Sequence, residues 1–587
     1  MIVPMKKVTI ITQAKDASAA VRSLCGLGVM HVEHCQPPKG KDISQIKDDL
    51  ELINQAMEVI SKAEFATGCE GSLMHKDISD WKLACRHIID TWNRLDQLQE
   101  FQHSLLLKIE EYSSWGDFDP GLIHQLAQKN VFVRLYQVPL KEMDQFPDGA
   151  VIKKIYSKSN TAYCVVVSRE KFECPFREIE LPKLGIAQMQ KRLSEDRRII
   201  EALSDDLKSF FCHYPKLSAI KRFLEKELEL QEALNGMSQA GILTYIRGFA
   251  PFDSEKPLRE VALKEKWGIC LDDPSPQDQV PTYLRNPKWI TLINPVFRMI
   301  EVVPGYHELD ISLMFLLFLS LFFGMIIGDA GYGLVYFILT FICQRIWGKK
   351  TKDKTVFFLF YLFSFCAIIW GLLTGTIFGQ EWYLAKGYRA LIPVLNDTKF
   401  LQTFCFFLGA FHLTLAHSWR AVLKFPSLTA LADAGWISVL WAAFFLARTL
   451  ILGYDFPFFG KWLIAIGIAL VILFTNPQRN IFKGIGEGLA TVALSLMNNF
   501  TDVVSYIRLF AVGLAGVAIS DTVNTLAATA GSGNVPVQIV IIFLGHTLNI
   551  VLGPMSVLVH GIRLNVLEFS GHANVTWSGV AYKPLKE

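Results

Sequence analysis

The sequence predicts a multi-domain protein in which N-terminal cytosolic α/β lobes, joined by long helical coiled-coil arms, precede an all-α polytopic membrane domain. Three observations lead to this fold class. Of the 587 residues, 51% are hydrophobic and the mean hydropathy is +0.30, although 19% are charged. Most charged residues lie before about residue 300, and the long apolar runs follow that point. In the first half, apolar residues recur at alternating spacings of three and four, which is typical of paired helices.

Composition argues against several classes of protein. The net charge is only +3, so it gives no case for nucleic-acid binding. The eleven cysteines are scattered, with no Cys-x-x-Cys pair, which argues against a zinc site or a disulfide scaffold and favours a reducing compartment. The stretch 1–12 lacks the apolar run of a signal peptide, so the first half is expected in the cytosol. We expect no cofactor and no metal.

Strands and helices alternate in the first half, and residues 1–300 are expected to form one cytosolic domain. Two apolar seams, at 43–60 and 186–210, indicate long helices that pair. Two small α/β lobes joined by these arms are the economical arrangement, and an ordinary α/β domain with a helical insert is the alternative. In chain order, the expected elements are a strand at 6–12, a helix at 16–27, a strand at 29–35, helices at 43–60 and 81–112, strands within 131–167, helices at 186–210 and 217–234, and a strand–helix–strand unit at 242–272.

Eight apolar runs follow, and residues 301–587 are expected to form a membrane domain of eight transmembrane helices. Each span needs about 20 apolar residues. The last two runs exceed the bilayer thickness, so these two helices must be long and tilted. The expected spans are 311–328, 331–347, 355–378, 400–422, 429–452, 459–475, 488–529 and 536–569.

Cationic residues are unevenly distributed between the expected loops. With eight spans, most of them fall on one side of the membrane, which marks that side as cytosolic. The opposite loop at 530–534 carries no charge, so both termini are expected in the cytosol. The cationic residues on the cytosolic side are Lys349, Lys350, Lys352, Lys354, Arg420, Lys424, Arg479, Lys483, Lys583 and Lys586.

Arg508 lies near the middle of the seventh expected span. An arginine at membrane depth is costly, and it keeps its proton, so it usually serves an ion pathway, a counter-ion or a helix clamp. Asn498, Thr501 and Ser505 precede it at spacings of three, four and three, so the four residues share one helix face. Asp502 lies about 120° around the helix and faces a neighbour or a separate cavity.

The eighth expected span repeats this pattern. Asn549, Ser556, His560 and Arg563 share one helix face, because their spacings of seven, four and three match the helical repeat. Glu568 follows near the cytosolic end. Two long helices, each with a polar stripe and an arginine, indicate a hydrated pathway between them.

A purely structural interpretation of the arginines stays open. A buried arginine can pair with a carboxylate simply to hold helices together. Asp329, Asp433 and Asp502 are available for such pairs. Matched polar stripes on two helices favour the pathway.

Isolated histidines in the spans are a weaker signal. A single histidine on an apolar helix is more often packed or hydrogen-bonded than part of a proton relay. We expect this of His412, His417 and His546.

The sequence contains no motif of a nucleotide-hydrolysing enzyme. The phosphate-binding pattern Gly-x-x-x-x-Gly-Lys-Ser/Thr is absent. Three alternating glycines at 484–488 lie between expected spans and lack the strand that a dinucleotide site requires. His31 and His34 lie at the end of an expected strand and are not expected to bind metal. We therefore do not expect the chain to be an enzyme.

The segment 505–515 contains Ser505, Tyr506 and Arg508 followed by small residues. This segment, the strongest of several, resembles one family, the stator membrane subunit of rotary V/A-type ATPases, called subunit a, or subunit I in bacteria and archaea. The resemblance extends in order along the whole chain, including the lobes joined by helical arms. The other matching segments are 281–287, 304–310, 323–333 and 560–569.

The resemblance implies a role in ion translocation, with ATP hydrolysis or synthesis on other subunits. In this family the cytosolic domain binds the peripheral stalks, and two tilted membrane helices face a rotating proteolipid ring. Arg508 would be the stator arginine, and Arg563 its partner on the next helix. The implied partners are the proteolipid c-ring, peripheral-stalk subunits of the E/G type, a central-stalk adaptor of the d/C type and membrane lipid. The candidate residues are Asn498, Thr501, Asp502, Ser505, Arg508, Ser556, His560, Arg563 and Glu568.

The sequence also departs from the eukaryotic members of this family. Gly516 and Gly553 stand where those relatives tend to carry a histidine and a glutamate, so other groups, such as Glu381, must line the outer half-channel. The compact chain suggests a bacterial or archaeal member in a prokaryotic plasma membrane. A secondary transporter with a substrate site near Arg508 is the alternative, although the membrane half shows no internal repeat. A membrane-anchored scaffold is a third interpretation. The sequence does not distinguish H⁺ from Na⁺.

Overall fold

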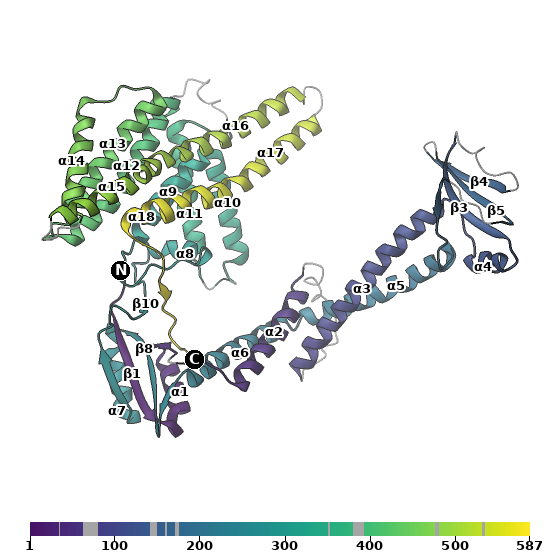
Figure 1. Ribbon diagram of the computed structural model, residues 1–587, viewed down its shortest axis with the longest axis horizontal. Coiled ribbons are helices and arrows are strands. Elements are labelled where there is room, and N and C mark those ends of the chain that lie inside the picture. The colour runs from purple at the N-terminus through teal and green to yellow at the C-terminus, as the bar shows by residue number, and fades with distance from the viewer. Residues whose placement is uncertain are drawn as a thin grey trace. The chain divides into compact units, whose positions relative to one another are not determined.

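The computed structural model is shown in Figure 1. It describes all residues except 35, 63–79, 141–149, 159–160, 171–174, 350, 352, 380–391, 476–480, 531–534 and 587. The chain divides into two compact units. The first comprises Met1–Ile10, Val29–Val32 and Arg247–Pro584, and the second comprises Ile11–Gly28, Glu33–Ile246 and Leu585–Glu587. The division of the chain at residue 300 stays a prediction.

Long helices in pairs form much of the second unit. They are α2 (Lys41–Ile60), α3 (Trp81–Ser113), α5 (Ile186–Phe211) and α6 (Tyr214–Asn235). α3 packs against α5 and α2 packs against α6, and Figure 1 shows each pair side by side. Buried Ile53, Ile88 and Leu207 come from three of these helices and join one core. The two apolar seams therefore mark helices that pair, while coiled-coil geometry stays a prediction.

A four-stranded antiparallel sheet also belongs to the second unit. Its order is β4-β5-β3-β6, and β3 pairs with β5 from Phe132 opposite Ser168 to Pro139 opposite Thr161. In β5 every second side chain is buried, as expected of a strand with one face on a core. The elements are α4 (Pro120–Gln128), β3 (Phe132–Pro139), β4 (Val151–Lys158), β5 (Thr161–Ser168) and β6 (Arg177–Ile179).

The second α/β region contains a sheet with the order β2-β8-β1-β9, and β7 pairs with β8. The strands and helices lie where the sequence predicts them, although β2 is shorter than expected and Cys35 lies outside the described residues. The two short strands β10 and β11 pair in parallel. The elements are β1 (Met5–Gln13), α1 (Ala17–Leu27), β2 (His31–Glu33), β7 (Ser238–Ala240), β8 (Leu243–Pro251), α7 (Glu255–Glu265), β9 (Gly268–Asp272), β10 (Pro281–Thr282) and β11 (Val580–Ala581).

Glu308, from one of the matching segments, binds the chain just after the last helix. Its carboxylate accepts hydrogen bonds from Gly305 N at 2.7 Å, Thr576 N at 2.9 Å and Thr576 Oγ1 at 2.5 Å. Burial opposes the charge of Glu308, but these hydrogen bonds outweigh it and hold the pKa of the carboxyl below its usual value. Glu308 therefore has a structural role.

The remainder of the first unit is dominated by apolar helices. Within the part of the chain that the structure describes, six helices are long and apolar enough to cross a membrane, and two shorter apolar helices, α9 and α14, accompany them. The eight expected spans thus all correspond to apolar helices among the described residues. Their bounds are α9 (Ser312–Ile327), α10 (Ala330–Trp347), α11 (Thr355–Thr374), α12 (Thr398–Lys424), α13 (Ala430–Leu452), α14 (Phe458–Phe474), α15 (Ile481–Ser505) with α16 (Ile507–Ala530), and α17 (Val535–Ser556) with α18 (Ser570–Ala573).

The last two expected spans are not continuous α-helices. The seventh is interrupted at Tyr506, between α15 and α16, where Leu509 N bonds to Tyr506 O three residues back. The eighth changes from α17 into the π-helical segments Val557–Gly561 and Leu564–Phe569 before α18. Both interruptions lie beside the arginines, and the tilt expected of these two long spans stays a prediction.

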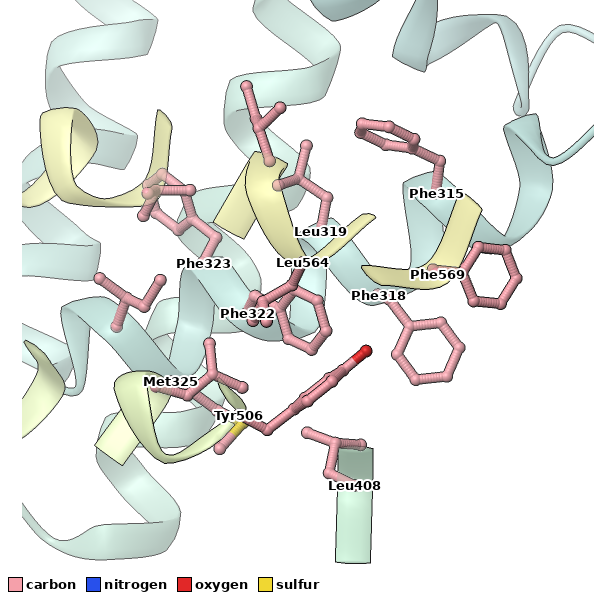
Figure 2. Close-up of a cluster of buried hydrophobic side chains, with 14 of the residues drawn as sticks. Phe315, Phe318, Leu319, Phe322, Phe323, Met325, Leu408, Tyr506, Leu564 and Phe569 are labelled. Atoms are coloured by element: carbon pink, nitrogen blue, oxygen red, sulfur yellow. The ribbon is translucent and has the colours of Figure 1, made fainter. Parts of the chain in front are cut away.

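A buried aromatic cluster holds the interruption at Tyr506 in place. Figure 2 shows Tyr506 among Phe318, Phe322 and Leu408, which belong to the same core cluster. Tyr506 is fully buried, and its hydroxyl lies 2.8 Å from His412 Nδ1. The His412 ring stacks on Phe318, with centroids 3.6 Å apart. A polar group in an apolar core is normally hydrogen-bonded. This contact satisfies the Tyr506 hydroxyl and His412 Nδ1, while His412 Nε2 has no hydrogen-bond partner among the described residues.

Gly409→Ala is expected to destabilise this region. A Cβ at Gly409 would lie 2.6 Å from Cδ2 of Tyr506, and overpacking of this kind typically costs about 1–3 kcal/mol. The melting temperature of the purified protein should therefore fall. Gly571→Ala is the control, because its Cβ would meet no atom within 4 Å. Equal melting temperatures for the two variants would contradict close packing of Tyr506 on α12.

Candidate functional site

Arg508 and Arg563 share one carboxylate, that of Glu568. Arg508 Nη1 and Arg563 Nε each lie 3.5 Å from Glu568 Oε1. The Glu568 side chain is 4% exposed, whereas those of Arg508 and Arg563 are 27% and 51% exposed. Two cations therefore face one anion at the boundary between buried and accessible surface, which leaves a net charge of +1.

The π-helical segment explains why Arg563 meets Glu568. In an α-helix, five residues turn the chain by about 140° beyond one full turn, so the two side chains would point apart. In a π-helix, i→i+5 bonding brings residues five apart onto one side. Leu564–Phe569 is π-helical, and Glu568 therefore lies under Arg563. Segments of this kind are frequent at functional sites.

Arg508 keeps unused hydrogen-bonding capacity. Its Nη2 donates to Ser505 Oγ at 3.0 Å, while its buried Nη1 makes no hydrogen bond with any described residue. The buried Glu568 Oε2 likewise has no hydrogen-bond partner in the described part of the chain. Buried charged groups usually have their hydrogen bonds satisfied, whereas here the enclosed parts of Arg508 and Glu568 interact mainly through their opposite charges.

The polar stripe predicted before Arg508 is present only in part. Ser505 contacts Arg508 and donates to Thr501 O at 2.9 Å, and Thr501 donates to Met497 O. These hydroxyls bond back along their own helix. The interruption at Tyr506 lies between these residues and α16, but the contact of Arg508 with Ser505 at 3.0 Å joins the two sides.

The three carboxylates available as structural partners of the arginines, those of Asp329, Asp433 and Asp502, contact other groups than Arg508. Asp329 is fully buried and accepts hydrogen bonds from Tyr332 N at 3.0 Å and Gly379 N at 2.7 Å. Asp433 contacts cationic residues of α12, and Asp502 faces His572. Among the described residues the carboxylate beside Arg508 is that of Glu568 and not one of these three, so the structural interpretation stays open with a different carboxylate.

Asn498 and Asp502 line a polar cavity on the α15 side of Arg508. The cavity has a volume of about 370 Å³ and also includes Ser495, Asn499 and Arg420. Asp502 Oδ2 lies 3.1 Å from His572 Nε2 at its wall. The sequence therefore correctly places Asp502 away from Arg508, against a separate cavity.

Two histidines meet at this cavity. His417 Nε2 lies 2.9 Å from His572 Nδ1, and His417 Nδ1 lies 3.2 Å from Asp433 Oδ1. Lys424 Nζ donates to Asp433 Oδ2 at 2.7 Å. His417 is hydrogen-bonded, as predicted for an isolated histidine. Its partner His572 was not predicted, since it lies beyond the expected end of the eighth span.

A second polar cluster, of uncharged groups, lies on the α16 side of Arg508. The Tyr332 hydroxyl is 2.7 Å from Ser520 Oγ and 2.6 Å from His546 Nδ1. Asn549 Nδ2 donates to Ser520 Oγ at 2.7 Å. His546 Nε2 is 3.0 Å from Asn524 Oδ1. Ser520 follows Arg508 by twelve residues, roughly 18 Å along a helix, so this cluster is well separated from the arginine.

The space over Gly553 is filled by a tyrosine. A Cβ at Gly553 would lie 2.8 Å from Tyr336 Oη. That hydroxyl donates to Ile550 O at 2.8 Å, the carbonyl that Pro554 leaves without its helical donor. Tyr336 therefore supplies the polar group beside Gly553. Glu381, suggested from the sequence for this side, lies outside the described residues.

Ser556 and His560 lie on either side of the change from α17 to π-helix. Ser556 lines a cavity of about 130 Å³ with Asn549, Gly516 and Tyr336. His560 lies near enough to Arg508 and Arg563 to experience their charge. All nine predicted residues thus lie in the first unit, but in three places: around Glu568, at the polar cavity, and toward the uncharged cluster.

Comparisons with known proteins match the whole chain. It is 30% identical over 633 residues to "V-type ATP synthase subunit I" of Borreliella burgdorferi, and the alignment covers 100% of both chains. It is 29% identical over 626 residues to "V-type ATP synthase subunit I 1" of Treponema pallidum, again covering 100% of both. The "A-type ATP synthase subunit I" of Methanocaldococcus jannaschii is 24% identical over 556 residues, which cover 81% of this chain and 78% of that protein.

Two other comparisons add little. No family model matches the chain. A crystal structure of the cytoplasmic N-terminal domain of subunit I, a homologue of subunit a of V-ATPase, aligns with 45% of this chain and 99% of its own at 13% identity. Its TM-score is 0.27, too low to support an argument about the fold. The full-length identity to the Borreliella protein is sufficient, and the chain belongs to the V-type and A-type ATP synthase subunit I family.

Proposed function

We propose that this chain is the stator membrane subunit of a rotary V/A-type ATPase, in which Arg508 faces the proteolipid ring. Membership of the subunit I family supports a membrane subunit of such a complex. One observation carries the finer assignment: Arg508 and Arg563 share a single carboxylate, that of Glu568, which leaves a net charge of +1, and the Arg508 side chain is still 27% exposed. A ring carboxylate is the partner that the exposed part of this guanidinium suits.

The chemistry of the site follows from a fixed positive charge. A carboxylate that arrives beside Arg508 is stabilised as the anion, so it releases its ion. A guanidinium stays charged after desolvation, whereas a lysine can lose its proton. Glu568 balances part of the charge, so Arg508 attracts the ring carboxylate without holding it permanently. The same charge opposes direct leakage of cations past the site.

The two polar clusters support two half-channels that meet the ring on opposite sides of Arg508. The inner one would start at the cavity lined by Asn498 and Asp502. The outer one would follow Tyr332, Ser520 and Asn549. These groups are uncharged, and they stand near Gly516 and Gly553, where the sequence departs from eukaryotic relatives.

We propose eight spans, with both termini in the cytosol. α9 and α14 are shorter than the other six, but spans of about 17 residues are within the known range. This topology puts the cationic ends of α12 and α15 and the end of the eighth span on one side. The domain at 1–300 would bind peripheral stalks of the E/G type, and the central-stalk adaptor of the d/C type would complete the complex.

Purification of the tagged chain from native membranes tests this function. We expect a proteolipid ring and stalk subunits to copurify, with ATP hydrolysis that depends on those partners. Arg508→Ala should copurify the same subunits, because Arg508 is needed for transport and not for assembly. Isolation of the chain alone, with substrate transport in proteoliposomes, would instead favour a secondary transporter.

A further inference from the structure

Four side chains form an unbranched line of hydrogen bonds at the polar cavity. In order they are Asp433, His417, His572 and Asp502, and they come from α13, α12, α18 and α15. The successive separations are 3.2, 2.9 and 3.1 Å. Asp433, His417 and His572 are buried, while the Asp502 side chain is 28% exposed. One end of the line is therefore enclosed and the other reaches the cavity.

The line requires one more proton than its groups ordinarily carry. Three hydrogen bonds need three donated protons. Two neutral imidazoles supply one N–H each, and ionised carboxylates supply none. With both aspartates ionised and both histidines neutral, one of the three contacts therefore lacks a proton. An additional proton, on an imidazole or on Asp502, completes all three bonds.

The surrounding charges decide which end the additional proton occupies. Asp433 Oδ2 accepts from Lys424 at 2.7 Å, and Asp433 Oδ1 lies 3.4 Å from Arg420. These cations keep Asp433 ionised, so His417 Nδ1–H points to it. His417 Nε2 then accepts from His572 Nδ1–H, and the additional proton lies between His572 Nε2 and Asp502, beside the cavity.

Other titratable groups face this line from the neighbouring elements. On α12, buried His412 lies in the field of His572. In the π-helical segment Leu564–Phe569, Glu568 is close enough to Asp502 for their negative charges to interact. The charges of both carboxylates also act on the Tyr506 hydroxyl. Arg508 and Arg563 neutralise Glu568. Arg420 also lines the cavity, and its Nη1 donates to His572 O at 2.8 Å. The Asp433 carboxylate, 3.4 Å from Arg420 Nη2, offsets this positive charge at the enclosed end of the line.

We infer that Asp502 and His572 form a proton-holding site, backed by His417 and Asp433, at the polar cavity on the α15 side of Arg508. The inference rests on the proposed function and names its ion as H⁺. A proton passes along nitrogen–nitrogen contacts, whereas a hard cation such as Na⁺ requires several oxygen ligands around it.

Asp502→Asn is the decisive substitution. Its amide donates to His572 Nε2, so all three hydrogen bonds form with neutral imidazoles and no additional proton. The variant therefore keeps any structural role of the hydrogen bond to His572, but its amide cannot take up and release a proton as the carboxyl can. We expect the reconstituted complex to assemble normally, while ATP-driven proton uptake into vesicles falls by about a hundredfold, a typical loss for a proton-transfer group. Asp502→Glu should recover part of the rate, because it restores the carboxyl.

Controls separate failure of this inference from failure of the proposed function. His307→Gln changes an exposed histidine outside the spans and should leave proton uptake unchanged. If Arg508→Ala abolishes uptake but Asp502→Asn keeps the wild-type rate and pH profile, the proton-holding site is wrong and the stator role stands. If Arg508→Ala itself transports normally, the stator role fails. Uptake of ²²Na⁺ by the wild type without vesicle acidification would also overturn the choice of proton.

Discussion

Arg508→Ala is expected to abolish ATP-driven ion transport in the reconstituted complex, while the subunits still assemble. The fixed charge that drives a ring carboxylate to release its ion is then missing. We expect the transport rate to fall by at least about a thousandfold, as when a preorganised charge-stabilising group is removed from an active site. That factor corresponds to about 4 kcal/mol. Acidification of vesicles, measured with a pH-sensitive dye, gives the rate.

Arg563→Ala is the matched control for this prediction. Arg508, Arg563 and Glu568 together carry +1, and loss of either arginine reduces the sum to zero. The two variants therefore share one net charge and differ only in position. Arg563 is 51% exposed and Arg508 27%, so we expect Arg563→Ala to reduce transport by only about tenfold, or 1.4 kcal/mol.

Arg508→Lys tests whether any cation suffices. Lysine cannot contact Ser505 and Glu568 with one rigid planar group, as Arg508 does, and it can lose its proton when desolvated. We expect this variant to transport as poorly as Arg508→Ala. Wild-type transport with lysine at this position, or an equal loss in Arg508→Ala and Arg563→Ala, would contradict the assignment of Arg508 as the stator arginine.

Local pattern predicted the helices and strands well. The apolar seam at 43–60 corresponds to α2, and the seam at 186–210 corresponds to α5, because a helix that packs on a partner must repeat its apolar residues every three to four positions. The apolar runs after residue 300 all became helices. Composition and periodicity are sufficient to predict a helix whose own apolar repeat or apolar run determines its position.

The detailed geometry of the site could not be predicted in the same way. The interruption at Tyr506 depends on His412 and Phe318, which lie far away in sequence. The π-helical turn that brings Glu568 under Arg563 cannot be detected by a search for the α-helical repeat. His572 lies outside the expected span, and only the fold brings it to His417. Tertiary packing, which overrides local propensity here, therefore determines which polar groups meet.

Glu568→Gln is expected to slow transport by about a hundredfold, or 2.7 kcal/mol. Without the carboxylate, Arg508 and Arg563 present an uncompensated +2, and removal of one partner of a buried ion pair typically leaves a penalty of about 3–5 kcal/mol. The ring carboxylate would satisfy that charge by binding Arg508 too tightly, so its release would become slow. Glutamine keeps the size of the side chain and should preserve assembly with the ring.

The double variant Glu568→Gln/Arg563→Ala distinguishes the effect of the Glu568 charge on transport from the effect of its packing. It restores the wild-type sum of +1, because one cation is removed together with the anion, while Arg508 stays in place. If excess charge slows the release of the ring carboxylate, the double variant should transport faster than Glu568→Gln alone. If Glu568 instead acts only through its packing, the second substitution should lower the rate further. Recovery in the double variant would therefore show that Glu568 sets how strongly Arg508 holds its partner.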